Sequence, residues 1–188
     1  MKIDLDSIAN SYMRNLRGAY EGLPVSKIKE LAIIIQSISE KNMVFIAGNG
    51  GSATTASHMA TDLGVGSLRR NNPIRCISLV ENTGVLTATS NDLDFSSIFS
   101  QQLKLLGKSG DILICFSASG NSKNLIDAIG TAKLLGINTV GITGFDGGQV
   151  KRICDHSVHI PTELGSYGIV EDLHSTVSHL LTELIRAS

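Results

Sequence analysis

The stretch that decides the fold runs from Met43 to Ala53 and reads MVFIAGNGGSA. Its first five residues are apolar, and such a run is too short for a helix but typical of a strand covered on both faces. A loop of small residues follows at 48–52, and the pattern becomes helical at Ala53. The stretch therefore predicts a strand, a tight turn and a helix, which is the repeating unit of a parallel sheet.

A second stretch of the same design begins at Ile112 and reads ILICFSASGNS, an apolar run before a hydroxyl-rich loop. Further apolar runs predict three more strands, over residues 74–80, 139–142 and 157–160. Helical periodicity predicts helices over residues 53–63, 84–90, 95–106, 121–135, 149–153 and 170–186. This alternation predicts an α/β fold, a three-layer α/β/α sandwich around a five-stranded parallel sheet with right-handed crossovers.

Two extra helices are predicted before the first strand, over residues 3–20 and 26–39. Gly22, Leu23 and Pro24 break the pair, and Ser26 is a candidate N-cap for the second helix. Because both precede any strand, we expect them to pack outside the main fold or against another subunit. With no internal repeat or linker in the sequence, we expect a single domain over 1–188, with N-terminal helices in 1–40 and an α/β core in 43–188.

The composition argues against several classes of protein. The 188 residues hold 16 Lys and Arg against 17 Asp and Glu, and a net charge of −1 is unlike a nucleic-acid-binding protein. No apolar run approaches the roughly 18–20 residues of a membrane helix, and the first residues lack a signal-peptide core. We therefore expect neither a nucleic-acid nor a membrane partner. Cys76, Cys115 and Cys154 are odd in number and far apart, so we expect buried, inert thiols in a cytoplasmic protein.

Both small-residue loops lie where parallel sheets bind ligands, beyond the carboxyl ends of the strands. Helix-start amides, the helix dipole and serine hydroxyls favour an anion there. Neither loop is followed by the lysine of a P-loop, which argues against ATP or GTP hydrolysis. Two alternatives stay open: the loops only make tight turns, or Gly48, Gly50 and Ala53 form a dinucleotide fingerprint with Glu81 on the ribose. A dinucleotide fold does not need the second serine loop, which weighs against the latter.

Ionisable residues gather on two of the predicted helices. His58 and Asp62 are four residues apart and share a helix face, as in a metal site, an acid–base pair or a plain surface pair. The last helix carries four more within nine residues: Glu171, Asp172, His174 and His179.

On the last helix, periodicity pairs Asp172 with His179 and leaves Glu171 about 80° away from His179. A polar helix face with satisfied histidines is the alternative. Asn91 and Asp92 fall in a predicted polar turn, where they are candidates for a helix cap or for contacts with sugar hydroxyls.

Taken in order, these motifs resemble the SIS (sugar isomerase) phosphosugar-binding family, and most of all its phosphoheptose isomerases. The motifs are GNGGSA at 48–53, His58-x-x-x-Asp62, Asn91-Asp92, SASGNS at 117–122, TGFDGG at 143–148, and the helix of Glu171 and His179. The resemblance covers nearly the whole chain, N-terminal helices included. It implies a homotetramer with sites shared between subunits.

The resemblance also implies a site, residue by residue. It assigns the phosphosugar to Asn49, Gly50, Gly51, Ser52, Asn91, Asp92, Ser117, Ala118, Ser119, Ser122 and Glu171. It assigns one Zn²⁺ per subunit to His58, Asp62, Glu171 and His179, with Asp172 left open as an alternative to Glu171. Asp62, or Glu171 if Asp62 cannot reach, would shuttle the proton, and His179 would act as acid and base.

The sequence departs from the family pattern at five positions. Asp62 stands where the family has a glutamate, and Glu171 where it has a glutamine. An arginine, an acidic residue and a threonine of the family are replaced by Gly66, Gly168 and Ala118. The metal ligands thus keep their chemical type, while groups that orient the substrate are partly lost.

The function that the resemblance implies is an aldose–ketose isomerase. It would convert sedoheptulose 7-phosphate to D-glycero-D-manno-heptose 7-phosphate through an enediol, for heptose and surface-polysaccharide precursors. The alternative is a non-catalytic SIS protein that binds a phosphosugar or a protein partner. Such relatives tend to lose the last-helix histidine, which this chain keeps as His179.

Overall fold

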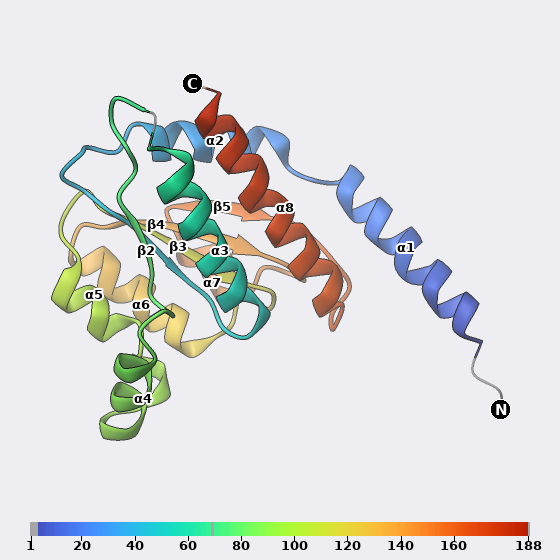
Figure 1. Ribbon diagram of the computed structural model, residues 1–188. Coiled ribbons are helices and arrows are strands. Elements are labelled where there is room, and N and C mark those ends of the chain that lie inside the picture. Colours follow the sequence, from blue (N-terminus) through green and yellow to red (C-terminus); the bar gives the residue numbers. More distant parts are fainter. Residues whose placement is uncertain (1–3, 69, 188) are drawn as a thin grey trace.

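A five-stranded parallel sheet forms the centre of the computed structural model, which describes residues 4–68 and 70–187 (Figure 1). In spatial order the strands are β2 (Cys76–Ser78), β1 (Val44–Ala47), β3 (Ile112–Ser117), β4 (Asn138–Thr143) and β5 (His156–His159). All four pairings are parallel, as predicted. The chain runs outward from β1 to β2 and then returns to the other side of β1 as β3, so the strand order reverses between β1 and β3.

Helices cover both faces of this sheet. The helical elements are α1 (Leu5–Glu21), α2 (Val25–Gln36), α3 (Gly51–Gly66), α4 (Thr83–Asp92), the 3₁₀ turn η1 (Phe95–Ser97), α5 (Ser100–Leu106), α6 (Lys123–Leu134), α7 (Gly148–Ile153) and α8 (Tyr167–Arg186). Side chains of α2, α3 and α8 form the core on one face, and those of α5, α6 and α7 form it on the other. The predicted three-layer sandwich is confirmed.

The central strands β1, β3 and β4 are buried on both faces, which explains why their sequences do not alternate between apolar and polar residues. In β1, Val44 and Ile46 point into the core beside α2, α3 and α8, while Phe45 and Ala47 point into the opposite core. The side chains of these four residues are fully buried. Each central strand therefore supplies apolar surface to two layers at once.

Several local predictions were wrong in detail. Ser26 does not cap α2: the helix begins at Val25 after Pro24, which has no side chain able to accept a capping bond, so Ser26 lies within the first turn. The predicted helix 95–106 is divided into η1 and α5. Asn91 and Asp92 do not form a turn but are the last two residues of α4, whose N-cap is Asn82.

The two N-terminal helices differ in how they pack. α2 belongs to a layer of the sandwich, since Ile28 and Ile35 are fully buried against the sheet; the expectation that it packs outside was wrong. α1 projects away from the body, as Figure 1 shows, and none of its residues is buried. It contacts α8 through hydrogen bonds from Tyr12 to Asp172 (2.8 Å) and between Tyr20 and Thr176 (3.1 Å).

The ends of the expected domain, residues 1–3 and 188, lie outside the described residues, as does Ile3, where the first predicted helix starts. Within the described ranges, no helix combines the length and apolar character needed to cross a membrane. The three cysteines are unpaired. Burial raises the pKa of Cys76 to about 11 and that of Cys154 to about 12, and it raises the pKa of the fully buried Cys115 as well, so these thiols stay protonated at neutral pH.

One titratable side chain is enclosed in the core. His174 of α8 is fully buried against Phe116, with 5.5 Å between ring centroids. Neither ring nitrogen has a hydrogen-bond partner among the described residues. Burial lowers the pKa of His174 to about 4, because the imidazolium cannot be solvated there.

This burial predicts acid-sensitive stability. Between pH 6.5 and about 4 the unfolded chain binds a proton that folded His174 does not, so the free energy of unfolding falls with pH by up to about 3 kcal/mol. Urea unfolding across this range should show the slope, and His174→Leu should flatten it. His156→Gln, which changes an exposed histidine, serves as the control. An unchanged slope in the His174 variant would contradict the prediction.

Candidate active site

A cleft of about 350 Å³ lies where the strand order reverses, beyond the carboxyl ends of β1 and β3. Three helices begin at its wall: α3 after Gly50, α6 after Ser122 and α8 at Tyr167. Helix starts present unpaired amides and a positive dipole end, so the cleft suits an anion. The lining residues are Asn49, Gly50, Gly51, Ser52, Phe116, Ser117, Ala118, Ser119, Ser122, Tyr167 and Glu171.

The hydroxyl-rich loop at 117–122, here called the serine loop, is held in shape by the TGFDGG segment at 143–148 and the residues that follow it. Gly120 adopts a left-handed φ of +65°, and a Cβ there would overlap the carbonyl oxygen of Gly147. The backbone of Val150 donates to the carbonyl of Gly120 (2.8 Å), and that of Gln149 donates to the Asn121 side chain (3.0 Å). Only glycine permits this close approach of two backbones, which explains why both segments are rich in it.

The hydroxyls of the loop divide into two groups. Ser117 and Ser119 accept hydrogen bonds from the loop's own amides, at Gly120 (3.0 Å) and Asn121 (3.2 Å), and so fix its turn. Ser122 is the N-cap of α6, yet its hydroxyl makes no capping bond. It is thus available to a ligand at the start of that helix.

The two small-residue loops are joined by a pair of amides. Asn49 donates to Asn124 (2.9 Å), and Asn124 donates back to Asn49 (2.8 Å). Asn124 is only 2% exposed and lies in the first turn of α6. The sequence analysis missed this residue, because nothing in the local sequence distinguishes it from an ordinary helical asparagine.

Glu171 faces the cleft from the first turns of α8. Its carboxyl lies against Gly51 at the start of α3, where a Cβ would overlap it. A carboxylate therefore already stands at the positive end of α3. The start of α6 and the serine loop remain for a bound anion.

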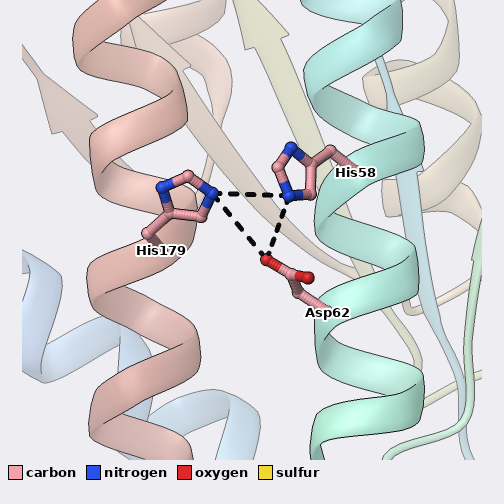
Figure 2. Close-up of side chains that lie close together, drawn as sticks. All are labelled: His58, Asp62 and His179. Carbon is pink, nitrogen blue, oxygen red and sulfur yellow. Dashed lines mark hydrogen bonds and ion pairs between the residues drawn. The ribbon is translucent and has the colours of Figure 1, made fainter.

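A cluster of ionisable side chains lies between α3 and α8 (Figure 2). His58 Nε2 is 3.4 Å from both Asp62 Oδ2 and His179 Nε2, and the distance from His179 Nε2 to that carboxylate oxygen is 3.9 Å. Both histidines are about half exposed, and Asp62 is more buried. The i, i+4 spacing brings His58 and Asp62 together on α3, and packing of the two helices brings His179 to them.

These three residues fit a zinc ion. Imidazole and carboxylate are its common ligands, and ligand atoms about 2 Å from a tetrahedral centre lie about 3.3 Å apart. The separations of 3.4, 3.4 and 3.9 Å are close to this value. Glu171 is not part of the cluster. It precedes His179 by eight residues, which is about 12 Å of helix.

Other predicted site residues lie elsewhere. Asn91 and Asp92 are exposed at the end of α4, outside the lining of the cleft, where Asn91 donates to Asp92 (2.8 Å). Asp172 accepts from Tyr12, and it is not part of the cluster around His179.

The two glycines that replace polar residues of the family pattern leave space that other side chains fill. A Cβ at Gly66 would lie 2.7 Å from Nε of Arg186, which reaches across from α8. A Cβ at Gly168 would lie 3.2 Å from the hydroxyl oxygen of Tyr12. Position 66 itself has no arginine, but the guanidinium of Arg186 lies beside it.

A family model of the SIS domain matches residues 12–144 of this chain, and this match defines the class of protein to which the fold and the cleft belong. A probable phosphoheptose isomerase of Thermoplasma acidophilum is 36% identical over 178 residues, which cover 94% of this chain and 97% of that protein. The phosphoheptose isomerase of Thermodesulfovibrio yellowstonii is 41% identical over 86% of this chain and 80% of its own length. A phosphoheptose isomerase structure from Francisella tularensis superposes with a TM-score of 0.88 at 26% identity, covering both chains completely. The chain therefore belongs to the phosphoheptose isomerase family of SIS domain proteins.

The amide pair between the two loops is testable. Asn124→Ala removes both hydrogen bonds and should lower the free energy of unfolding by about 1–3 kcal/mol, measured with urea. It should also weaken binding of inorganic phosphate, measured by calorimetry, because Asn49 is released. Asn138→Ala, at an exposed asparagine, is the control. Equal effects of the two substitutions on the free energy of unfolding and on phosphate binding would show that the Asn49–Asn124 pair does not stabilise the cleft.

Proposed function

We propose that this protein is an aldose–ketose isomerase that converts sedoheptulose 7-phosphate to D-glycero-D-manno-heptose 7-phosphate, for heptose and surface-polysaccharide precursors. One observation carries this function: His58, Asp62 and His179 converge within 4 Å of one another, on two helices that both start at the cleft. Acid–base groups and an anion cleft are what proton transfer on a phosphorylated sugar requires. The names of the relatives at 36% and 41% identity support the same substrate.

The cleft binds the phosphate end of the sugar. Amides at the start of α6 and the hydroxyls of Ser117, Ser119 and Ser122 are the donors, and the neighbouring Asn49 to Ser52 segment contacts the sugar chain. Anchoring the distant phosphate orients the reacting end of the molecule. Asn91 and Asp92 lie outside the lining of this cleft and are given no part in the contact with the sugar.

Isomerisation moves one proton between C1 and C2 and another between their oxygens, through a cis-enediol. Asp62 is the base that removes the carbon-bound proton and returns it to the neighbouring carbon. His179 would exchange protons with the ring oxygen and O1 through the ring nitrogen that does not hold a metal. When bound by His58, Asp62 and His179, Zn²⁺ supplies polarisation of the carbonyl and hydroxyl oxygens.

A second copy of the chain completes the site. Within one chain, Glu171 stands at the cleft while His179 is about 12 Å further along α8, so one Glu171 cannot serve both places. In a homotetramer, Glu171 of another copy would reach the cluster as its fourth ligand. The exposed apolar side chains of α1, Leu5, Ile8 and Met13, supply a surface for that assembly. The three cysteines are unpaired, which fits the reducing cytoplasm expected from the sequence.

Turnover of sedoheptulose 7-phosphate in a coupled assay tests the function. Asp62→Asn and His179→Ala should each lower kcat by about 10²-fold or more, because a positioned acid or base is lost. A chelator should reduce wild-type turnover, and both variants should still bind inorganic phosphate. His156→Ala, at an exposed histidine on β5, should remain fully active. Full activity in the cluster variants would refute their roles, and phosphosugar binding without any wild-type turnover would favour the non-catalytic alternative.

The assembly has its own test in sedimentation velocity. The wild type should sediment as a tetramer, and Ile8→Glu with Met13→Glu should dissociate it, because charges would be placed in an apolar contact. Leu134→Glu, at a residue 90% exposed on α6, should leave the tetramer intact. A monomeric wild type would overturn the shared site.

A further inference from the structure

Tyr167 is a cleft residue that no sequence motif indicated. It is the first residue of α8, and its side chain lines the cleft together with the serine loop and Glu171. Its exposed fraction is 55%, so the ring lies at the border of cleft and solvent. A bound phosphosugar would therefore meet this side chain.

The ring of Tyr167 is held by the TGFDGG segment. It packs edge-on against Phe145, with 5.0 Å between ring centroids and 80° between the planes. Phe145 is itself 4% exposed, and its backbone amide donates to the hydroxyl of Thr162 (3.0 Å). This aromatic contact holds the partly exposed ring in one orientation. Less conformational entropy of the side chain is therefore lost when a ligand binds.

The hydroxyl of Tyr167 differs from those of the other two tyrosines. Tyr12 and Tyr20 hydrogen-bond to Asp172 and Thr176 on α8. The hydroxyl of Tyr167 has no hydrogen-bond partner within residues 4–68 and 70–187. It is thus the tyrosine donor that remains for a ligand.

Among the described residues that line the cleft, Glu171 is the only charged one, and it is an anion. Lys123 follows Ser122 directly, but its ammonium group is engaged by Asp127 (2.7 Å) and Ser96 (3.2 Å). The described lining therefore offers a phosphate neutral donors. A phenol hydroxyl at the rim is more acidic than a serine hydroxyl and forms a strong hydrogen bond to a charged oxygen.

We propose that Tyr167 is a specificity-determining residue whose hydroxyl donates a hydrogen bond to the phosphate group of the bound phosphosugar. This rests on the proposed function for the identity of the sugar, but not for the phosphate contact. Tyr167 anchors the phosphate end and takes no part in proton transfer.

Tyr167→Phe removes only the hydroxyl, and Tyr20→Phe, whose hydroxyl bonds outside the cleft, is the matched control. Calorimetry with inorganic phosphate should show Kd raised about fivefold to tenfold in Tyr167→Phe and unchanged in Tyr20→Phe. In steady-state assays KM should rise by a similar factor while kcat stays within about twofold, because uniform binding is lost. Thermal melting should show both variants folded.

Phosphate Kd and KM equal to those of Tyr20→Phe would overturn the proposal, and so would a loss confined to kcat. The two proposals can also fail separately. If the wild type binds phosphate but does not turn over sedoheptulose 7-phosphate, the isomerase function is refuted. The comparison of phosphate Kd values still decides the role of Tyr167.

Discussion

Parallel pairing of β1 with β3 is the constraint on which the rest of the structure depends. It places the ends of two strands side by side where the strand order reverses, and so brings together loops that are about seventy residues apart in sequence. Because each strand leads directly into a helix, the starts of α3 and α6 converge on one cleft. The Asn49–Asn124 pair then fixes the distance between the loops.

The packing of α3 against α8 is the second determinant. The two helices run in the same direction: Gly51 meets Glu171 at their starts, His58 meets His179 midway, and Gly66 meets Arg186 near their ends. Both helices therefore start at the cleft and carry the His–Asp–His cluster about two to three turns further along. Small residues on α3 allow this approach, since Cβ atoms at Gly51 or Gly66 would overlap side chains of α8.

The sequence was sufficient to predict most features that depend on local pattern, although the predictions for the cap of α2 and the end of α4 were wrong. Buried strands, glycine loops and the pairing of His58 with Asp62 follow from residue spacing within one element. The separation of Glu171 from His179 was also contained in their spacing on one helix, yet the family pattern assigned both to one metal. Asn124 and Tyr167 were not predictable, because their importance comes from partners far away in sequence, Asn49 and Phe145. The same holds for Arg186 beside Gly66.

The described lining of the cleft contains no lysine or arginine, which affects how an anionic ligand approaches and binds. Charged side chains attract anions over distances near a Debye length, whereas amides and hydroxyls act only on contact. Capture is then governed by shape rather than by long-range attraction, and ionic strength changes it little. An anion whose outline does not match the loops makes fewer of these contacts, so a sugar phosphate is selected over competing anions by the contacts it makes within the cleft.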